Sequence, residues 1–264
     1  MATECFLFGG FVIITTAIWV YVLRERPFEF LAYAMFLPGA TALVWSFFKG
    51  TLREFVWMTS GLDQPVSSIV YSIVSMVMVV ALVQMCVKVS SHIGWAQKVE
   101  MRASAIHGHN RNYVSGFMRA AGEEVGWRCF LLPCLVQRYS TNQAILICGV
   151  FWGLFHVPVM VLLMSLTKPQ RPRTTAIVQC VSCVFAAFTH GWVAIKSGYS
   201  MWPASVMHWF WNVYNPTVLG SIYTNTPGHY TGEQWKINGE GLMGCLVMAP
   251  VVAIICIEQN NWTL

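Results

Sequence analysis

Charged residues are scarce in this sequence. Only 10% of its 264 residues are Asp, Glu, Lys or Arg, against about a quarter in an average soluble domain. Hydrophobic residues make up 56% of the chain and the mean hydropathy is +0.56. The sequence also lacks internal repeats, low-complexity runs and any polar stretch long enough for a soluble appendage. These absences exclude an ordinary water-soluble domain and indicate a protein that lies in a lipid bilayer.

Long apolar windows occur along the whole chain. A membrane-spanning helix needs about 20 mostly apolar residues. Seven windows meet this length, near residues 6–23, 28–48, 66–88, 142–165, 174–196, 201–222 and 241–258. An eighth window, 122–138, is less apolar because it contains Glu123, Glu124 and Arg128. The pattern predicts an all-α fold, a polytopic membrane protein with about eight transmembrane helices in a single domain, residues 1–264.

The positive charges predict how the helices are oriented. With eight spans and the N-terminus outside, the loops near 24–27, 89–121, 166–173 and 223–240 face the cytoplasm. Together with Lys88 at the edge of the second loop, they carry eleven of the sixteen Lys and Arg residues, and the opposite side carries four, which follows the positive-inside rule. Contact with anionic lipid explains the net charge of +5, so we expect no nucleic-acid partner. The segment 89–121 is predicted to form an interfacial amphipathic helix.

Most of the nine cysteines lie within or at the edge of a predicted span: Cys86, Cys129, Cys134, Cys148, Cys180, Cys183, Cys245 and Cys256. Cys180 and Cys183 form a CxxC pair, but no second pair is present to complete a zinc site. We interpret these residues as free cysteines that pack as small hydrophobic groups. Their number does not indicate an oxidising compartment.

The stretch GEEVGWR (122–128) concentrates charge inside an apolar region. On a helix, Glu124 and Arg128 stand at positions i and i+4 and can form an ion pair. Glu123 is rotated by about 100° from Glu124, so it is not committed to that pair. Alternatively, both acids simply lie at the start of a helix, where the helix dipole favours negative charge.

Two further spans carry polar groups. FWGLFHVP (151–158) places His156 one turn after Trp152, and HWFWN (208–212) places His208 and Asn212 one turn apart. A lone intramembrane histidine, such as His190 in THGW, is interpreted as an interhelical hydrogen-bonding group. Glutamate, two imidazoles and an amide supply what amide hydrolysis requires, namely a base for water and donors for the oxyanion.

The order EExxxR, aromatic-xxx-His, HxxxN resembles the CPBP family of intramembrane proteases, which includes CAAX prenyl proteases and Abi-type bacteriocin-processing enzymes. EEVGWRCFLLPCL (123–135) continues with the LLP typical of the family, and FWGLFHVPVMVLL (151–163) is similar to its second motif. The resemblance covers about residues 115–258. It implies a catalytic core there, preceded by N-terminal helices over about residues 1–90.

The resemblance also implies roles for individual residues. Glu123 would activate the attacking water with help from His156. His208 and Asn212 would stabilise the oxyanion of the tetrahedral intermediate. The supporting residues would be Glu124, Arg128 and Trp152, the last of which stands where the family often has Phe.

A metal ion is an alternative to this mechanism. Glu123, His156 and His208 would make a His2Glu set, which suits catalytic zinc with one open position. The sequence has no HExxH motif, and Asn212 is a poor zinc ligand but a good oxyanion donor. We therefore favour a mechanism without a cofactor and keep zinc as the alternative.

The resemblance predicts a hydrolase, an intramembrane endopeptidase that cleaves near the cytoplasmic face. The expected partners are membrane lipid and a peptide or prenylated CAAX protein, in the endoplasmic reticulum membrane of a eukaryote or the plasma membrane of a bacterium. The sequence assigns no oligomeric state.

Three alternatives stay open. The first is an inactive scaffold or immunity protein with the same fold, and the second is a non-peptidase membrane enzyme of a biosynthetic pathway. The third is a proton-coupled transporter, against which the absence of inverted repeats counts.

Overall fold

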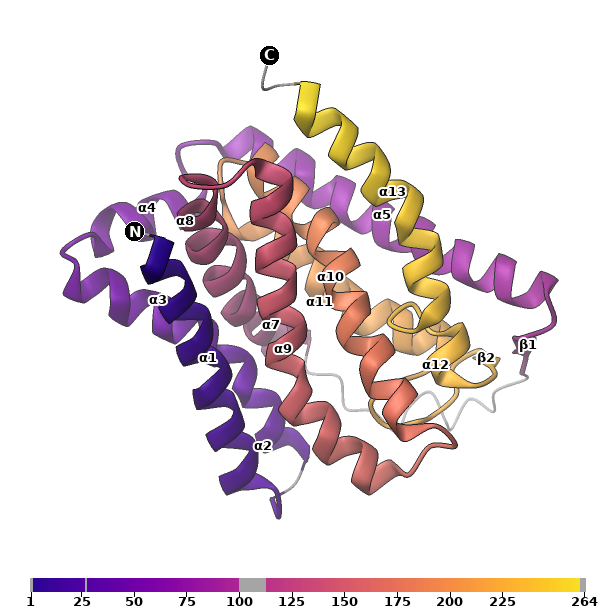
Figure 1. The fold of residues 1–264 in the computed structure, drawn as a ribbon. Coiled ribbons are helices and arrows are strands. Elements are labelled where there is room, and N and C mark those ends of the chain that lie inside the picture. Colours follow the sequence, from indigo (N-terminus) through magenta and orange to yellow (C-terminus); the bar gives the residue numbers. More distant parts are fainter. Residues whose placement is uncertain (1, 27, 100–112, 262–264) are drawn as a thin grey trace.

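The computed structural model describes residues 2–26, 28–99 and 113–261. They form a bundle of helices with one short pair of strands (Figure 1). The main helices are α1 (Ala2–Leu23), α3 (Leu37–Phe48), α5 (Pro65–His92), α7 (Tyr113–Gly126), α8 (Leu132–Val136), α9 (Thr141–Thr167), α10 (Pro172–Lys196), α11 (Met201–Leu219) and α13 (Leu242–Asn261). The short elements are α2 (Phe28–Ala32), η1 (Tyr33–Phe36), α4 (Leu52–Ser60), η2 (Trp127–Leu131), α12 (Gln234–Ile237), β1 (Gln97–Lys98) and β2 (Tyr230–Thr231). The prediction of an all-α polytopic membrane protein is confirmed.

Six helices in the described part of the chain are long and apolar enough to cross a membrane. They are Thr3–Leu23, Phe30–Phe48, Pro65–His92, Thr141–Thr167, Pro172–Lys196 and Gln234–Gln259. The two other expected spans, 122–138 and 201–222, correspond to α7–η2–α8 and to α11. α11 packs against α5, α7 and α10, and α7 packs against α3. Helices enclosed by other helices need little apolar surface of their own. The number of eight transmembrane helices stays a prediction.

Glycines let α7 approach its neighbours closely. A Cβ at Gly39 of α3 would lie 2.5 Å from the carbonyl oxygen of Gly122, and a Cβ at Gly126 would collide with Pro38. Gly122 and Gly126 flank the two glutamates in a G-xxx-G spacing, which is typical of close helix contacts in membranes. The face of α7 that bears these glycines therefore packs against η1 and α3.

The helix changes pitch directly after the glutamates. Residues Trp127–Leu131 form a π-helical segment, followed by α8 with Pro133 at its start. Proline has no N–H and crowds the carbonyl four residues earlier, and widening the turn relieves this conflict. Such π segments are frequent at functional sites, and Arg128 lies in this one.

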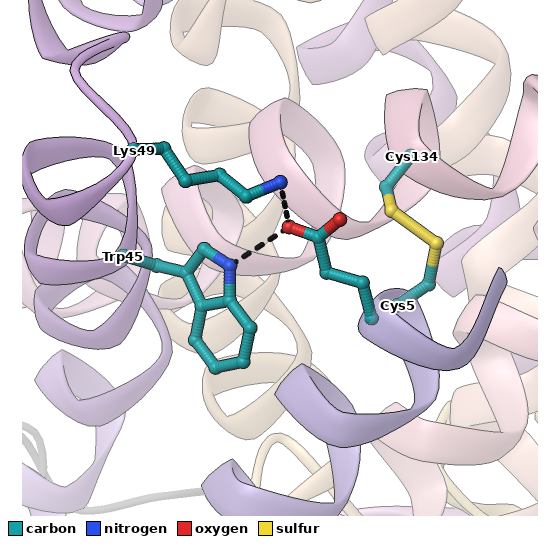
Figure 2. The surroundings of a disulfide bond; sticks show 5 residues. Cys5, Trp45, Lys49 and Cys134 are labelled. Carbon is teal, nitrogen blue, oxygen red and sulfur yellow. Dashed lines mark hydrogen bonds and ion pairs between the residues drawn. A yellow bond between two sulfur atoms is a disulfide. The ribbon is translucent and has the colours of Figure 1, made fainter. Parts of the chain in front are cut away.

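A disulfide joins Cys5 of α1 to Cys134 of α8, with the Cα atoms 6.0 Å apart (Figure 2). The interpretation of Cys134 as a free cysteine is therefore wrong, because folding brings to it a residue 129 positions away. The remaining cysteines of the described chain are free. Next to the disulfide, Glu4 accepts a hydrogen bond from Trp45 Nε1 at 2.9 Å and pairs with Lys49.

This disulfide lies at the start of α1, the end of the bundle away from the Lys- and Arg-rich loops. Disulfides persist in oxidising compartments. The orientation in which this end faces away from the cytoplasm stays a prediction.

The segment predicted as an interfacial helix, 89–121, lies partly outside the described residues. α5 continues to His92, and Gln97 and Lys98 pair as a strand with Thr231 and Tyr230. α7 already begins at Tyr113. The described parts of this segment are thus the ends of two long helices and a strand.

Candidate active site

The two adjacent glutamates are both buried but have different partners. Glu123 is 2% exposed and Glu124 is fully buried. Glu124 forms the predicted ion pair with Arg128, at 3.2 Å. Its Oε1 also lies 2.7 Å from Nδ1 of His208. Because successive helical residues point about 100° apart, Glu123 faces another neighbour, the Trp152 indole.

Trp152 on α9 connects the polar groups. Its Nε1–H donates a hydrogen bond of 2.7 Å to Glu123 Oε2. The Arg128 guanidinium lies over its ring, 4.0 Å from the centroid, which is a cation–π contact. The ring also packs edge-on against His156 and His208, with centroid distances of 5.9 and 5.6 Å. The Trp152 indole therefore holds the Glu123 carboxylate as well as packing against both histidines.

Both predicted histidines have a defined hydrogen-bonding state at Nδ1. His156 Nδ1 lies 2.8 Å from the Trp152 carbonyl oxygen, one turn earlier on the same helix. His208 Nδ1 lies 2.7 Å from a Glu124 oxygen. Carbonyl and carboxylate oxygens only accept hydrogen bonds, so in both rings Nδ1 carries the hydrogen. In both rings Nε2 is the nitrogen left for other partners.

Three of the four predicted catalytic residues line one small cavity. Trp152, His156, His208 and Asn212 line it, and Glu123 adjoins it through Trp152. Asn212 is solvent-exposed in the structure. The cavity has a volume of about 40 Å³, room for about three water molecules. The structure thus brings together residues of α7, α9 and α11 that lie up to 89 positions apart in the sequence.

Glu124 has one contact that the sequence predicts and one that it does not. The pair with Arg128 was expected, whereas the contact with His208 was not. Sequence spacing indicates the Arg128 contact because that contact lies within one helix. The His208 contact depends on how α7 and α11 pack.

Sequence reasoning missed several cavity residues. His190, Gln179 and Ser182 of α10 line the cavity, as do Tyr223 and Glu240. The interpretation of His190 as an interhelical hydrogen-bonding group is wrong, because its Nδ1 bonds Ala186 within α10. Polar residues at helical spacing in the window 174–196 were a usable signal for the α10 residues.

Glu240 lies between α12 and α13 and had no comparable sequence signal. Trp211 Nε1 donates to its Oε1 at 3.0 Å, and Asn238 Oδ1 accepts a hydrogen bond from its main-chain N–H at 2.9 Å. The Tyr223 hydroxyl lies next to this carboxyl. Glu240 Oε2 makes no hydrogen bond in the structure. Glu240 is thus a second carboxyl group at the cavity, fixed by the loop that carries it.

The zinc alternative requires Glu123, His156 and His208 to converge on one ion. Among the described residues, no group of three or more His, Cys, Asp and Glu side chains is arranged to hold a metal ion. In addition, Trp152 already occupies one oxygen of Glu123. We derive no step through a metal.

These observations define a class of protein, a multi-pass membrane protein with a buried glutamate–histidine site. Residues 112–214 match the family model described as type II CAAX prenyl endopeptidase Rce1-like. The match confirms the resemblance to the CPBP family of CAAX proteases, a family of intramembrane peptidases. It includes every residue of the three motifs and ends before Tyr223 and Glu240. No curated protein sequence matches the chain.

Proposed function

We propose that this protein is an intramembrane endopeptidase that hydrolyses a peptide bond near the cytoplasmic face, using water activated by Glu123. The observation that carries the proposal is the Glu123 carboxylate itself. It is buried, one oxygen is fixed by Trp152, and within the described chain no Lys or Arg forms an ion pair with it. A carboxylate held in this way keeps its second oxygen available to take a proton from water.

His156 supports the same step. Its Nδ1–H is committed to the Trp152 carbonyl, so Nε2 presents a lone pair that can accept a hydrogen bond from the water. Trp152 therefore fixes both groups, Glu123 through its indole N–H and His156 through its main-chain carbonyl. This shared anchor favours one pre-organised water between the two residues.

His208 and Asn212 are suited to stabilising the oxyanion. Nε2 of His208 donates to an oxyanion only when the ring is doubly protonated. The Glu124 carboxylate at Nδ1 favours that state, as in other carboxylate–histidine pairs. Arg128 offsets the charge of Glu124 from its other side. Asn212, one turn after His208, adds a neutral N–H donor at the cavity.

The position of the site supports cleavage from the cytoplasmic side. Glu123 lies ten residues after the start of α7 and His156 eleven residues before the end of α9. At 1.5 Å per residue, both are about 15 Å from helix ends that lead into the Lys- and Arg-rich loops. A prenylated C-terminal peptide fits this arrangement, because its isoprenoid can stay in the bilayer while the peptide reaches the site.

The test is cleavage of a prenylated CAAX peptide by purified protein in lipid nanodiscs. We expect release of the C-terminal peptide, little release from the unprenylated peptide, and none with Glu123→Gln. Glu124→Gln should retain more turnover than Glu123→Gln because the base remains. A folded wild-type protein that cleaves neither peptide would contradict the proposal, and equal activity of Glu123→Gln and wild type would contradict the assignment of the base.

A further inference from the structure

His190 is a third imidazole at the cavity, and the proposed mechanism does not use it. It lies on α10 and is 3% exposed. Its Nδ1 lies 2.8 Å from the carbonyl oxygen of Ala186, one turn earlier. Because a carbonyl only accepts, Nδ1 carries the hydrogen. The neutral ring therefore presents a lone pair at Nε2.

This second nitrogen has no protein partner. His190 Nε2 is fully buried and makes no hydrogen bond in the structure. A buried acceptor without a donor is costly, so native proteins rarely keep one without a function. The ring lines the same cavity as His208 and Asn212, with its centroid 6.0 Å from that of His208. A donor on a molecule bound in the cavity would supply the missing partner.

His190 and His208 face the cavity with opposite hydrogen-bonding character. His208, beside the Glu124 carboxylate, is suited to donate. His190, with its Nδ1–H on a neutral carbonyl, is suited to accept. A trans peptide group matches such a pair, because its C=O and N–H point in opposite directions.

From this match we infer that His190 Nε2 accepts a hydrogen bond from the N–H of the scissile peptide group. The inference rests on the proposed endopeptidase function. A peptide group whose oxygen is held by His208 and Asn212 turns its N–H away from them, towards another wall of the cavity. His190, on the adjacent helix α10, supplies the acceptor there. Two opposed contacts fix the plane of the amide for attack.

The experiment compares two substrates that differ at one atom. The first is the prenylated peptide, and the second is the same molecule with the scissile N–H replaced by an ester oxygen. Wild type, His190→Phe and His190→Gln are assayed on both, and His92→Phe is the matched control because His92 is exposed at the end of α5. The ester has no N–H to donate. Because each variant is compared with wild type on the same substrate, the higher intrinsic reactivity of the ester cancels.

On the amide, His190→Phe should lower kcat/KM by about 10- to 100-fold, as expected for leaving one partner of a buried hydrogen bond unpaired. On the ester it should change kcat/KM within about twofold, the range of uncoupled changes. His190→Gln, which keeps an acceptor oxygen, should recover part of the loss on the amide. His92→Phe should change neither reaction.

An equal loss on amide and ester would assign His190 a packing role and overturn the inference. Unchanged amide cleavage by His190→Phe would also overturn it, while leaving the endopeptidase function intact. Failure of wild type to cleave either substrate would instead refute the proposed function, and this inference with it. If His190→Phe is not recovered as folded protein, His190→Leu carries the same comparison because leucine also lacks an acceptor.

Discussion

Replacing Trp152 by phenylalanine removes the single N–H that holds the proposed base. In the structure this N–H lies 2.7 Å from Glu123 Oε2. The Arg128 guanidinium lies 4.0 Å from the centroid of the Trp152 ring. Phenylalanine keeps an aromatic ring beneath it. It also keeps the main-chain carbonyl that fixes His156. The substitution therefore isolates the hydrogen bond to the carboxylate from the packing around it.

A hydrogen bond to a charged group contributes about 1.5–3 kcal/mol. Because about 1.4 kcal/mol corresponds to a tenfold change in rate, Trp152→Phe should lower kcat by about 10- to 150-fold. KM should change little, since the indole N–H contacts the carboxylate and not the substrate. The loss arises because Glu123 is no longer held in the orientation that activates water.

The matched control is Trp192→Phe. Trp192 also donates its indole N–H to a carboxylate, Glu258 Oε2 at 2.6 Å, and does not line the cavity. Both variants lose one N–H to a carboxylate, but only Trp152 lies at the cavity. Kinetics on the prenylated peptide and thermal unfolding in the same detergent should show the kcat loss for Trp152→Phe alone. A kcat within about threefold of wild type in a folded Trp152→Phe protein would refute the role given to this contact.

Three further outcomes are expected. Asn212→Ala should lower turnover about 10²- to 10³-fold with little change in KM, as for other oxyanion donors; if Asn212 only packs between helices, turnover per folded molecule will instead be preserved, as active-site titration would show. Chelators should leave peptide cleavage unchanged, whereas loss of activity that returns with added zinc would favour the metal route. Reduction of the Cys5–Cys134 disulfide, which closes a loop with a sequence separation of 129 residues, should lower the free energy of unfolding by at most about 5 kcal/mol. Thermal unfolding with and without reductant measures this effect, and a Cys5→Ser/Cys134→Ser protein should be insensitive to reductant.

Much of the site was predictable because its motifs are local. The Glu124–Arg128 pair follows from i, i+4 spacing, and the Trp152–His156 contact from the same helical period. Each contact is decided within one turn of helix, so the order of residues suffices. The apolar windows likewise predict most of the helices, because the bilayer requires long apolar segments.

The contacts that give the site its chemistry lie between helices. Glu124 and His208 are 84 residues apart, and Cys5 and Cys134 are 129 apart. Helical period determines which residues share a face, but it does not determine which face meets which partner. At α7 that choice depends on Gly122 and Gly126, whose missing side chains admit η1 and α3.

The sequence by itself therefore determined the membrane class, most of the helices and the polar residues of each span. Only the tertiary structure decided that Glu124 would serve His208, that Trp152 would hold Glu123, and that His190 would face the cavity with an unpaired nitrogen. The physical reason is that the rotation of each helix about its axis is fixed by close packing with its neighbours. A rotation of one residue position, about 100°, would exchange the environments of the two adjacent glutamates.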